Sequence, residues 1–141
     1  MDHSDFHPLN KKLKLTREQW QTMERCVSEH APLEACGLLA GKNDIVLKVL
    51  EVSNQAQSPV RFVMDPLEQL NAFEWIDSND LDLLAIFHSH PTGPETVSVT
   101  DIAEAAYVVI HIICSPKNGK WQARGFWIED KQAFEITLEI V

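Results

Sequence analysis

Two histidines separated by one residue, followed by an aspartate, are the side chains of this sequence best suited to chemistry. His88 and His90 end a strongly strand-like run. Because side chains alternate along a strand, both imidazoles point to the same side and can meet one metal ion. The loop after His90 is long enough to fold Asp101 back as a third ligand. Two histidines and one carboxylate are the ligand set of a catalytic zinc site, which leaves a fourth position for water.

Zinc lowers the pKa of a bound water toward about 7 and so supplies hydroxide at neutral pH. Such a site also needs a general base and a group that stabilises a developing oxyanion. A His-x-His pair alone is weak evidence, because histidines occur at this spacing on surfaces and in cores. The position strengthens the interpretation, since a proline-containing loop follows the strand and Ser98 and Asp101 stand where a helix begins.

The segment HSHPTGPETVSVTD, which begins at His88, resembles the signature of the JAMM (MPN-plus) metalloprotease family. That signature includes a glutamate upstream, and EACGLLAG, which begins at Glu34, fits it. The resemblance covers almost the whole chain and is closest to the small stand-alone prokaryotic members, because the chain leaves little room for long insertions. Many relatives have proline directly before the motif serine, where this chain has Val97, so the loop is expected to be less stiff.

The resemblance implies a role for each motif residue. His88, His90 and Asp101 would bind one Zn²⁺ ion. Glu34 would accept a proton from the attacking water and deliver it to the leaving amine, and Ser98 would hydrogen-bond the oxyanion. The simpler alternative, that Ser98 caps a helix, is compatible with this role. The implied substrate is an amide bond at the C-terminal Gly-Gly of a ubiquitin-like or sulfur-carrier protein, which is the expected partner.

Two other functions are considered. The first is an MPN-type scaffold or binding module in which zinc is not catalytic. The presence of both Glu34 and Ser98 argues against it, because a structural site needs neither residue and usually has four protein ligands. The second is a zinc deaminase, a family with a related layout, but the chain lacks the paired-cysteine motif of those enzymes.

Three helices are expected to position these residues. The first begins at Thr16, with Gln19 completing a capping box. The second begins at Asp65 with Pro66 at its first position and Glu68 as the box partner. The third spans residues 101–106. The inner face of the second helix is assigned to Leu67, Leu70, Phe73 and Ile76.

Strands are expected at residues 34–41, 45–52, 61–64, 81–90, 107–114, 120–129 and 134–140. Residues 1–14 are expected to be a loose arm. His111 lies within one of these strands and is interpreted as a core histidine with satisfied hydrogen bonds. The order of elements favours an α/β (α+β) fold with a mixed central sheet flanked by helices. The family resemblance implies the layout shared by MPN proteins and cytidine deaminases.

Length and composition limit the function. A chain of 141 residues can form one domain with a real core, so residues 1–141 are expected to be a single domain. The net charge of −9 argues against binding to nucleic acid or to a membrane surface. Neither a signal peptide nor a membrane-spanning segment is apparent, so a cytoplasmic location is expected. The cysteines are interpreted as reduced, buried side chains: Cys26, Cys36 and Cys114.

Overall fold

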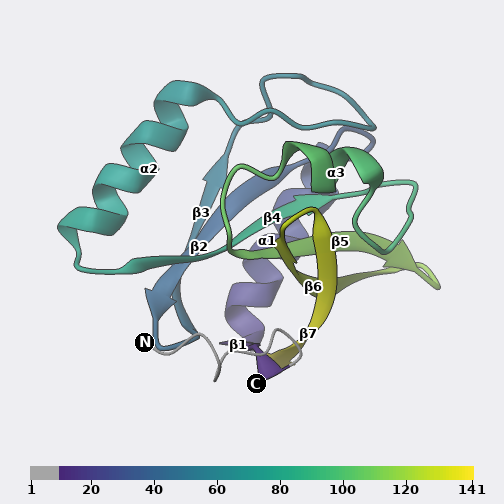
Figure 1. Cartoon of the computed structure of the whole chain (residues 1–141). Coiled ribbons are helices and arrows are strands. Elements are labelled where there is room, and N and C mark those ends of the chain that lie inside the picture. Colours follow the sequence, from purple (N-terminus) through teal and green to yellow (C-terminus); the bar gives the residue numbers. More distant parts are fainter. Residues whose placement is uncertain (1–9) are drawn as a thin grey trace.

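A computed structural model describes residues 10–141 and shows strands with helices inserted between some of them along the chain (Figure 1). The elements in chain order are β1 (Lys12–Leu15), α1 (Arg17–His30), β2 (Cys36–Lys42), β3 (Ile45–Val52), α2 (Pro66–Ser78), β4 (Asp82–Ser89), α3 (Val99–Glu104), β5 (Ile110–Lys117), β6 (Lys120–Glu129) and β7 (Gln132–Ile140). No helix within these residues is long and apolar enough to cross a membrane.

The strands form a closed barrel in the order β1-β3-β2-β4-β5-β6-β7. The pairing is mixed, since β4 and β5 are parallel whereas β2 and β4 are antiparallel. The predicted α+β class with a mixed sheet is therefore confirmed. Because β4 lies between β2 and β5, residues at its end can be contacted from two neighbouring strands.

Strand β1 corrects the prediction of a loose arm over residues 1–14. Residues 12–15 pair in parallel with β7, and Lys14 also pairs with Ile45 of β3. Leu13 and Leu15 are fully buried while Lys12 and Lys14, which alternate with them, face outward, so Lys-Leu-Lys-Leu is a half-buried strand. Residues 1–9 of the expected arm lie outside the described residues.

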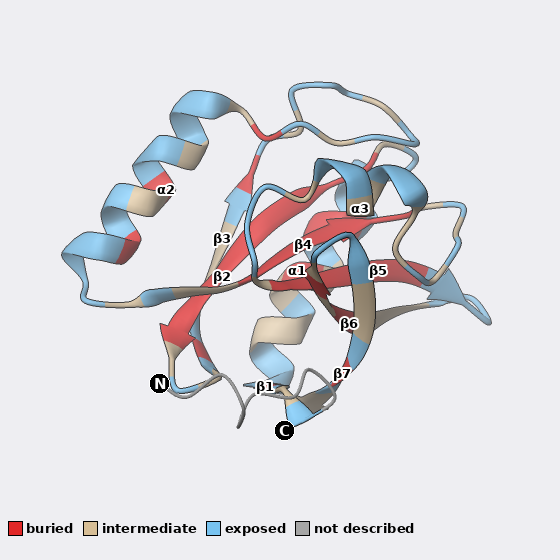
Figure 2. Ribbon diagram, in the orientation of Figure 1, coloured by how far each residue is buried: buried red, intermediate tan, exposed pale blue. Residues whose placement is uncertain are grey.

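Two apolar clusters lie on opposite faces of β2 and β4, whose buried residues are red in Figure 2. On β4, Ala85 and Phe87 pack in the cluster that includes buried residues of α1. Ile86 faces the other way and packs in the cluster of α2. Strand alternation puts His88 on the same face as Ile86, so the candidate ligands belong to the α2 side of the sheet.

The helix starts follow the local sequence. Thr16 and Gln19 form the predicted capping box of α1. Asp65 caps α2 by accepting hydrogen bonds from the backbone N–H groups of Leu67 and Glu68. The Glu68 side chain does not complete a second box, because its carboxylate accepts a hydrogen bond from the backbone N–H of Ser53.

The inner face of α2 differs from the prediction. Leu67 and Leu70 are 66% and 53% exposed, whereas Ala72 and Ile76 are buried and Phe73 is half-buried. The helix is therefore rotated so that a small residue, Ala72, approaches the sheet. Apolar residues lie on several sides of this helix, so their spacing in the sequence does not identify which side is buried.

Two strand predictions also need correction. Residues 61–64 do not form a strand, and only an isolated bridge joins Met64 to Asn54. Strand β5 begins at Ile110, three residues later than expected, and continues to Lys117, three residues past the expected end at residue 114. The cysteines agree with the prediction, since all three are free and buried.

Candidate metal centre

The pairing of β2 with β4 brings Glu34 to the two histidines. Cys36 lies opposite His88 in this antiparallel pair. The backbone N–H of Ser89 donates to the Ala35 carbonyl at 3.0 Å, and the Ala35 N–H donates to the Ser89 hydroxyl oxygen at 2.8 Å. Continuing the same register places Glu34 opposite His90. Because cross-strand partners share a face, the carboxylate lies on the same side of the sheet as both imidazoles.

Candidate ligand atoms of three residues converge at equal separations. The Nε2 atoms of His88 and His90 are 3.1 Å apart. The two carboxylate oxygens of Asp101 lie 3.1 Å from these atoms, Oδ1 from His88 and Oδ2 from His90. Ligands at about 2.0–2.1 Å from a tetrahedral zinc ion would be separated by about 3.3 Å. The arrangement therefore fits a small tetrahedral cation, and the sequence-predicted triad is brought together.

The surroundings of His90 favour a nitrogen lone pair that faces this point, and the His88 ring is held in place by packing. The Nδ1 atom of His90 donates to the Pro94 carbonyl at 2.8 Å, so its Nε2 carries the lone pair in the neutral ring. The His88 ring is fully buried and stacks on Phe62 at a centroid distance of 4.3 Å. Its Nδ1 has no hydrogen-bond partner among the described residues.

Helix α3 presents Asp101 through a capping box. The Ser98 hydroxyl oxygen accepts from the Asp101 N–H at 3.0 Å, and Asp101 Oδ2 accepts from the Ser98 N–H at 2.8 Å. The expectation that Ser98 caps this helix is confirmed, with the helix starting at Val99 instead of residue 101. A hydroxyl that accepts a hydrogen bond still has its own proton to donate. Ser98 can therefore serve as both a cap and a donor.

Charges in the site are strongly coupled. Burial raises the pKa of Asp101, but hydrogen bonds from His88 and His90 outweigh it and hold that pKa below its usual range. Burial lowers the pKa of His88 and favours the neutral ring that metal ligation requires. Burial also lowers the pKa of His90, but Asp101 and the Pro94 carbonyl raise it more. The two rings therefore differ, since the site favours a neutral His88 while the Asp101 carboxylate favours positive charge on His90.

Glu34 has the properties of a proton acceptor. Its side chain is 3% exposed, and its Oε1 atom has no hydrogen-bond partner among the described residues. Burial raises its pKa to about 7, with His90 opposing and Asp101 adding to the effect. Ligand atoms of Glu34, His88 and His90 lie within 4.8 Å of one another, so Glu34 is an alternative third ligand. The shorter contacts of Asp101 favour Asp101 as the ligand and leave Glu34 free to act as a base.

A charged network anchors the loop that follows His90. Glu95 accepts hydrogen bonds from Gln122 at 2.7 Å and from Arg124 at 2.8 Å, both on β6. Arg124 also binds the Glu135 carboxylate through two nitrogens, at 2.8 and 2.6 Å. Because Glu95 directly follows Pro94, this network helps to hold the carbonyl that orients His90.

Sequence reasoning assigned no role to several residues that shape the site. Ser89 joins the Glu34 segment to β4, Phe62 stacks on His88, and Glu95 anchors the loop. Ser89 could have been recognised from the alternation within His-Ser-His, which sends its side chain away from the histidines. The partners of Phe62 and Glu95 lie far away in sequence, so no local pattern indicates their roles.

Comparison with known proteins agrees with this geometry. Residues 16–128 match the family of prokaryotic homologs of the JAB domain. This chain belongs to that family. The predicted relationship to small prokaryotic JAMM proteins is thereby confirmed.

Related proteins of this JAB family span most of the chain. A desampylase from Pyrococcus furiosus is 39% identical over 117 residues, covering 81% of each chain. A probable TtuB-protein conjugate cleaving protease from Thermus thermophilus is 40% identical over 112 residues, covering 79% of this chain and 71% of its own. A Desulfitobacterium hafniense protein with a solution structure is 32% identical, with a TM-score of 0.82 and 92% coverage of both chains.

Proposed function

We propose that this JAB-family chain is a zinc-dependent isopeptidase or peptidase that hydrolyses an amide bond at the C-terminal Gly-Gly of a ubiquitin-like or sulfur-carrier protein. The observation that carries the proposal is the equal 3.1 Å separation of the candidate ligand atoms, with a buried carboxylate beside them. Two relatives are named as a desampylase and as a protease that cleaves protein conjugates, which supports this class of substrate.

His88, His90 and Asp101 would hold one zinc ion. A bound zinc ion polarises the amide carbonyl and lowers the pKa of water. Glu34, with a pKa raised to about 7 by burial, can take a proton from the attacking water at neutral pH and return it to the leaving amine. Ser98 can donate its hydroxyl proton to the carbonyl oxygen as negative charge develops there. Each proton transfer is thus assigned to a side chain of this protein.

The scaffold alternative is less well supported. A protein that only binds a partner has no use for a buried carboxylate without a hydrogen-bond partner, because burying such a group is unfavourable. The Glu34 Oε1 atom is in that situation, and it lies beside the candidate ligands. An unpaired carboxylate at this position is expected in an enzyme in which Glu34 must be free to exchange protons.

The test compares wild type with Glu34→Gln on the full chain. Each protein is loaded with zinc, its metal content is measured by mass spectrometry, and cleavage of a Gly-Gly conjugate of a sulfur-carrier protein is followed. We expect one zinc ion per chain in both proteins and about 10²–10⁴-fold slower cleavage by the variant. Glu29→Gln, an exposed substitution on α1, should retain full activity. Equal activity of Glu34→Gln would refute the proposed base, and a wild type that binds zinc but cleaves no conjugate would favour the scaffold.

A further inference from the structure

The side-chain amide of Asn54 hydrogen-bonds four backbone groups just after β3. Its Oδ1 atom accepts from the N–H groups of Ala56 at 3.0 Å and Val63 at 2.9 Å. Its Nδ2 atom donates to the carbonyl oxygens of Glu34 and Arg61, each at 3.0 Å. An amide offers two donor protons and an oxygen that accepts two hydrogen bonds, so these contacts use all of its capacity. Asn54 therefore links its own loop to the residue proposed as the base.

The loop over residues 53–65 holds both backbone polar groups of Glu34. Glu34 lies before the first residue of β2, Cys36, so it is outside the regular strand. Its N–H donates to the Ser58 carbonyl at 2.8 Å, and its carbonyl accepts from Asn54. The Glu34 side chain is buried, and its Oε1 atom has no hydrogen-bond partner among the described residues. The backbone contacts therefore have a large part in deciding where the carboxylate lies.

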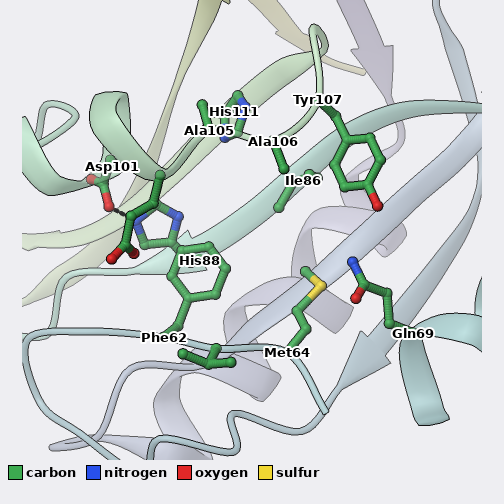
Figure 3. Close-up of a pocket in the computed structure, with 12 residues that line it drawn as sticks. Phe62, Met64, Gln69, Ile86, His88, Asp101, Ala105, Ala106, Tyr107 and His111 are labelled. Carbon is green, nitrogen blue, oxygen red and sulfur yellow. Dashed lines mark ion pairs between the residues drawn. The ribbon is translucent and has the colours of Figure 1, made fainter. Parts of the chain in front are cut away.

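The same loop also reaches the candidate metal centre. Phe62 stacks on the His88 ring, and Figure 3 shows these two side chains next to each other, with Met64 further along the loop. An isolated bridge between Asn54 and Met64 closes the loop at its base. Asn54 thus lies where the two ends of the loop meet, and the loop contacts the proposed base at one point and a proposed zinc ligand at another.

A purely structural role for Asn54 is the simpler alternative. Three of its four hydrogen bonds lie within the loop, whose irregular backbone needs partners for its polar groups. The fourth leaves the loop and ends on Glu34, 20 residues away in sequence. A structural role predicts the same loss of rate whether or not residue 34 can act as a base. A positioning role predicts a loss that depends on the Glu34 carboxylate.

We propose that Asn54 is a positioning residue for hydrolysis, and that its hydrogen bond to the Glu34 carbonyl fixes the Glu34 carboxylate beside the candidate metal ligands. The inference rests on the proposed function for the role of Glu34 as the base. The next residue along the chain, Ala35, is held from β4 by the Ser89 hydroxyl. The segment that carries the base is therefore held from two elements, the loop over residues 53–65 and β4.

The first experiment is a double-substitution cycle in the zinc-loaded full chain, with cleavage of a Gly-Gly conjugate of a sulfur-carrier protein as the assay. Asn54→Asp keeps an acceptor for the loop N–H groups but replaces the donor by a carboxylate oxygen. We expect kcat to fall at least about tenfold, because displacement of a reacting group by about 1 Å can cost about 10²-fold. KM and zinc affinity should each change by less than about threefold, because Asn54 contacts none of the candidate metal ligands in the described residues.

The Glu34→Gln background separates the two roles. Because the base is already absent there, Asn54→Asp should lower the residual rate by less than about twofold. An equal fall in both backgrounds would overturn the proposal. If Asn54→Asp does not fold, Asn54→Ala, which introduces no charge, takes its place in both backgrounds.

Glu68→Ala is the matched control. It removes the hydrogen bond that Glu68 accepts from the Ser53 N–H at 3.2 Å, so it loosens the same end of the loop without removing a contact to Glu34. This variant should retain kcat within about twofold. A fall as large as that of Asn54→Asp would show that the stability of the loop sets the rate, and would count against the proposal.

A second experiment does not require cleavage. Crystal structures of the zinc-loaded wild type and of the zinc-loaded Asn54 variant are compared. We expect the Glu34 carboxylate to shift by about 1 Å while the zinc ligands stay in place. An unmoved carboxylate would refute the proposal, even if the variant cleaves slowly. A wild type that cleaves no conjugate would instead count against the proposed function, and a displaced carboxylate would still support the role of Asn54.

Discussion

Replacing Ser89 by alanine should separate the position of the proposed base from the binding of metal. The Ser89 hydroxyl is fully buried and accepts the Ala35 N–H at 2.8 Å. Its removal leaves that buried N–H without its partner, which costs about 1–3 kcal/mol. With an unfolding entropy of about 2.1 cal/mol/K per residue over this chain, a loss of about 2 kcal/mol lowers Tm by about 7 °C.

The effect of Ser89→Ala on catalysis should be larger than its effect on metal affinity. Glu34 directly precedes Ala35, so a loosened Ala35 shifts the carboxylate, and misplacement by about 1 Å can cost about 10²-fold in rate. We expect kcat to fall about tenfold or more. The candidate ligands lie on the opposite face of β4, so zinc affinity should change by less than about threefold.

The measurements are thermal unfolding, zinc competition with a chromogenic chelator, and cleavage at saturating substrate. Ser115→Ala is the matched control, because Ser115 is equally buried but its hydroxyl oxygen accepts a longer, weaker hydrogen bond, from the Gln122 side chain at 3.4 Å. An unchanged Tm and kcat in Ser89→Ala would refute the reasoning. A loss of zinc affinity as large as the loss of kcat would show that Ser89 supports the ligands and not the base.

Three further predictions concern the loop after His90, the side chain of His111 and the core. Glu95→Ala should weaken zinc affinity by up to about tenfold, because it releases the loop that orients His90, and an unchanged affinity in chelator competition would contradict this. Burial lowers the pKa of His111 from 6.5 to about 4. As the pH falls, the His111 ring therefore gains a proton in the unfolded chain at a higher pH than in the folded chain, which favours unfolding. Wild type should therefore lose about 3 kcal/mol of unfolding free energy relative to His111→Leu between pH 7 and pH 4, measured by denaturant titration. Gly37→Ala should cost at least about 1–3 kcal/mol, because the new Cβ would meet both the Phe87 ring and the backbone carbonyl of Leu50, and in a Phe87→Leu background the cost should be smaller but should persist because the Leu50 carbonyl stays in place.

Local signals in the sequence predicted much of the fold. The cap at Thr16 and the Asp65-Pro66 start are decided by hydrogen bonds within one turn, so both helices begin where expected. The motif from His88 to Asp101 is equally local, and its residues meet as predicted.

Features that depend on distant partners were missed or misassigned. Strand β1 is stabilised by β7, from the far end of the chain. Because lysines alternate with its two leucines, the short segment is too polar to be recognised as a strand from the sequence alone. Which side of α2 is buried depends on the sheet it packs against, so Leu67 and Leu70 were misplaced. His111 is buried, but its Nε2 atom has no hydrogen-bond partner among the described residues, so the expectation of a core histidine with satisfied hydrogen bonds is corrected. This unpaired nitrogen could not be anticipated, because only the folded structure shows which polar groups lack a partner.

The site combines residues that are close together in the sequence with a segment that is distant in the sequence. His90 and Asp101 are 11 residues apart, whereas the contact that fixes the Glu34 segment joins residues 54 apart. Closing the longer loop costs about 1 kcal/mol more in chain entropy. Under the proposed roles, a growing or partly unfolded chain can assemble its metal ligands before β2 joins β4, but it then has no base. Hydrolysis becomes possible only when β2 has joined β4, so cleavage is a stricter test of correct folding than metal content.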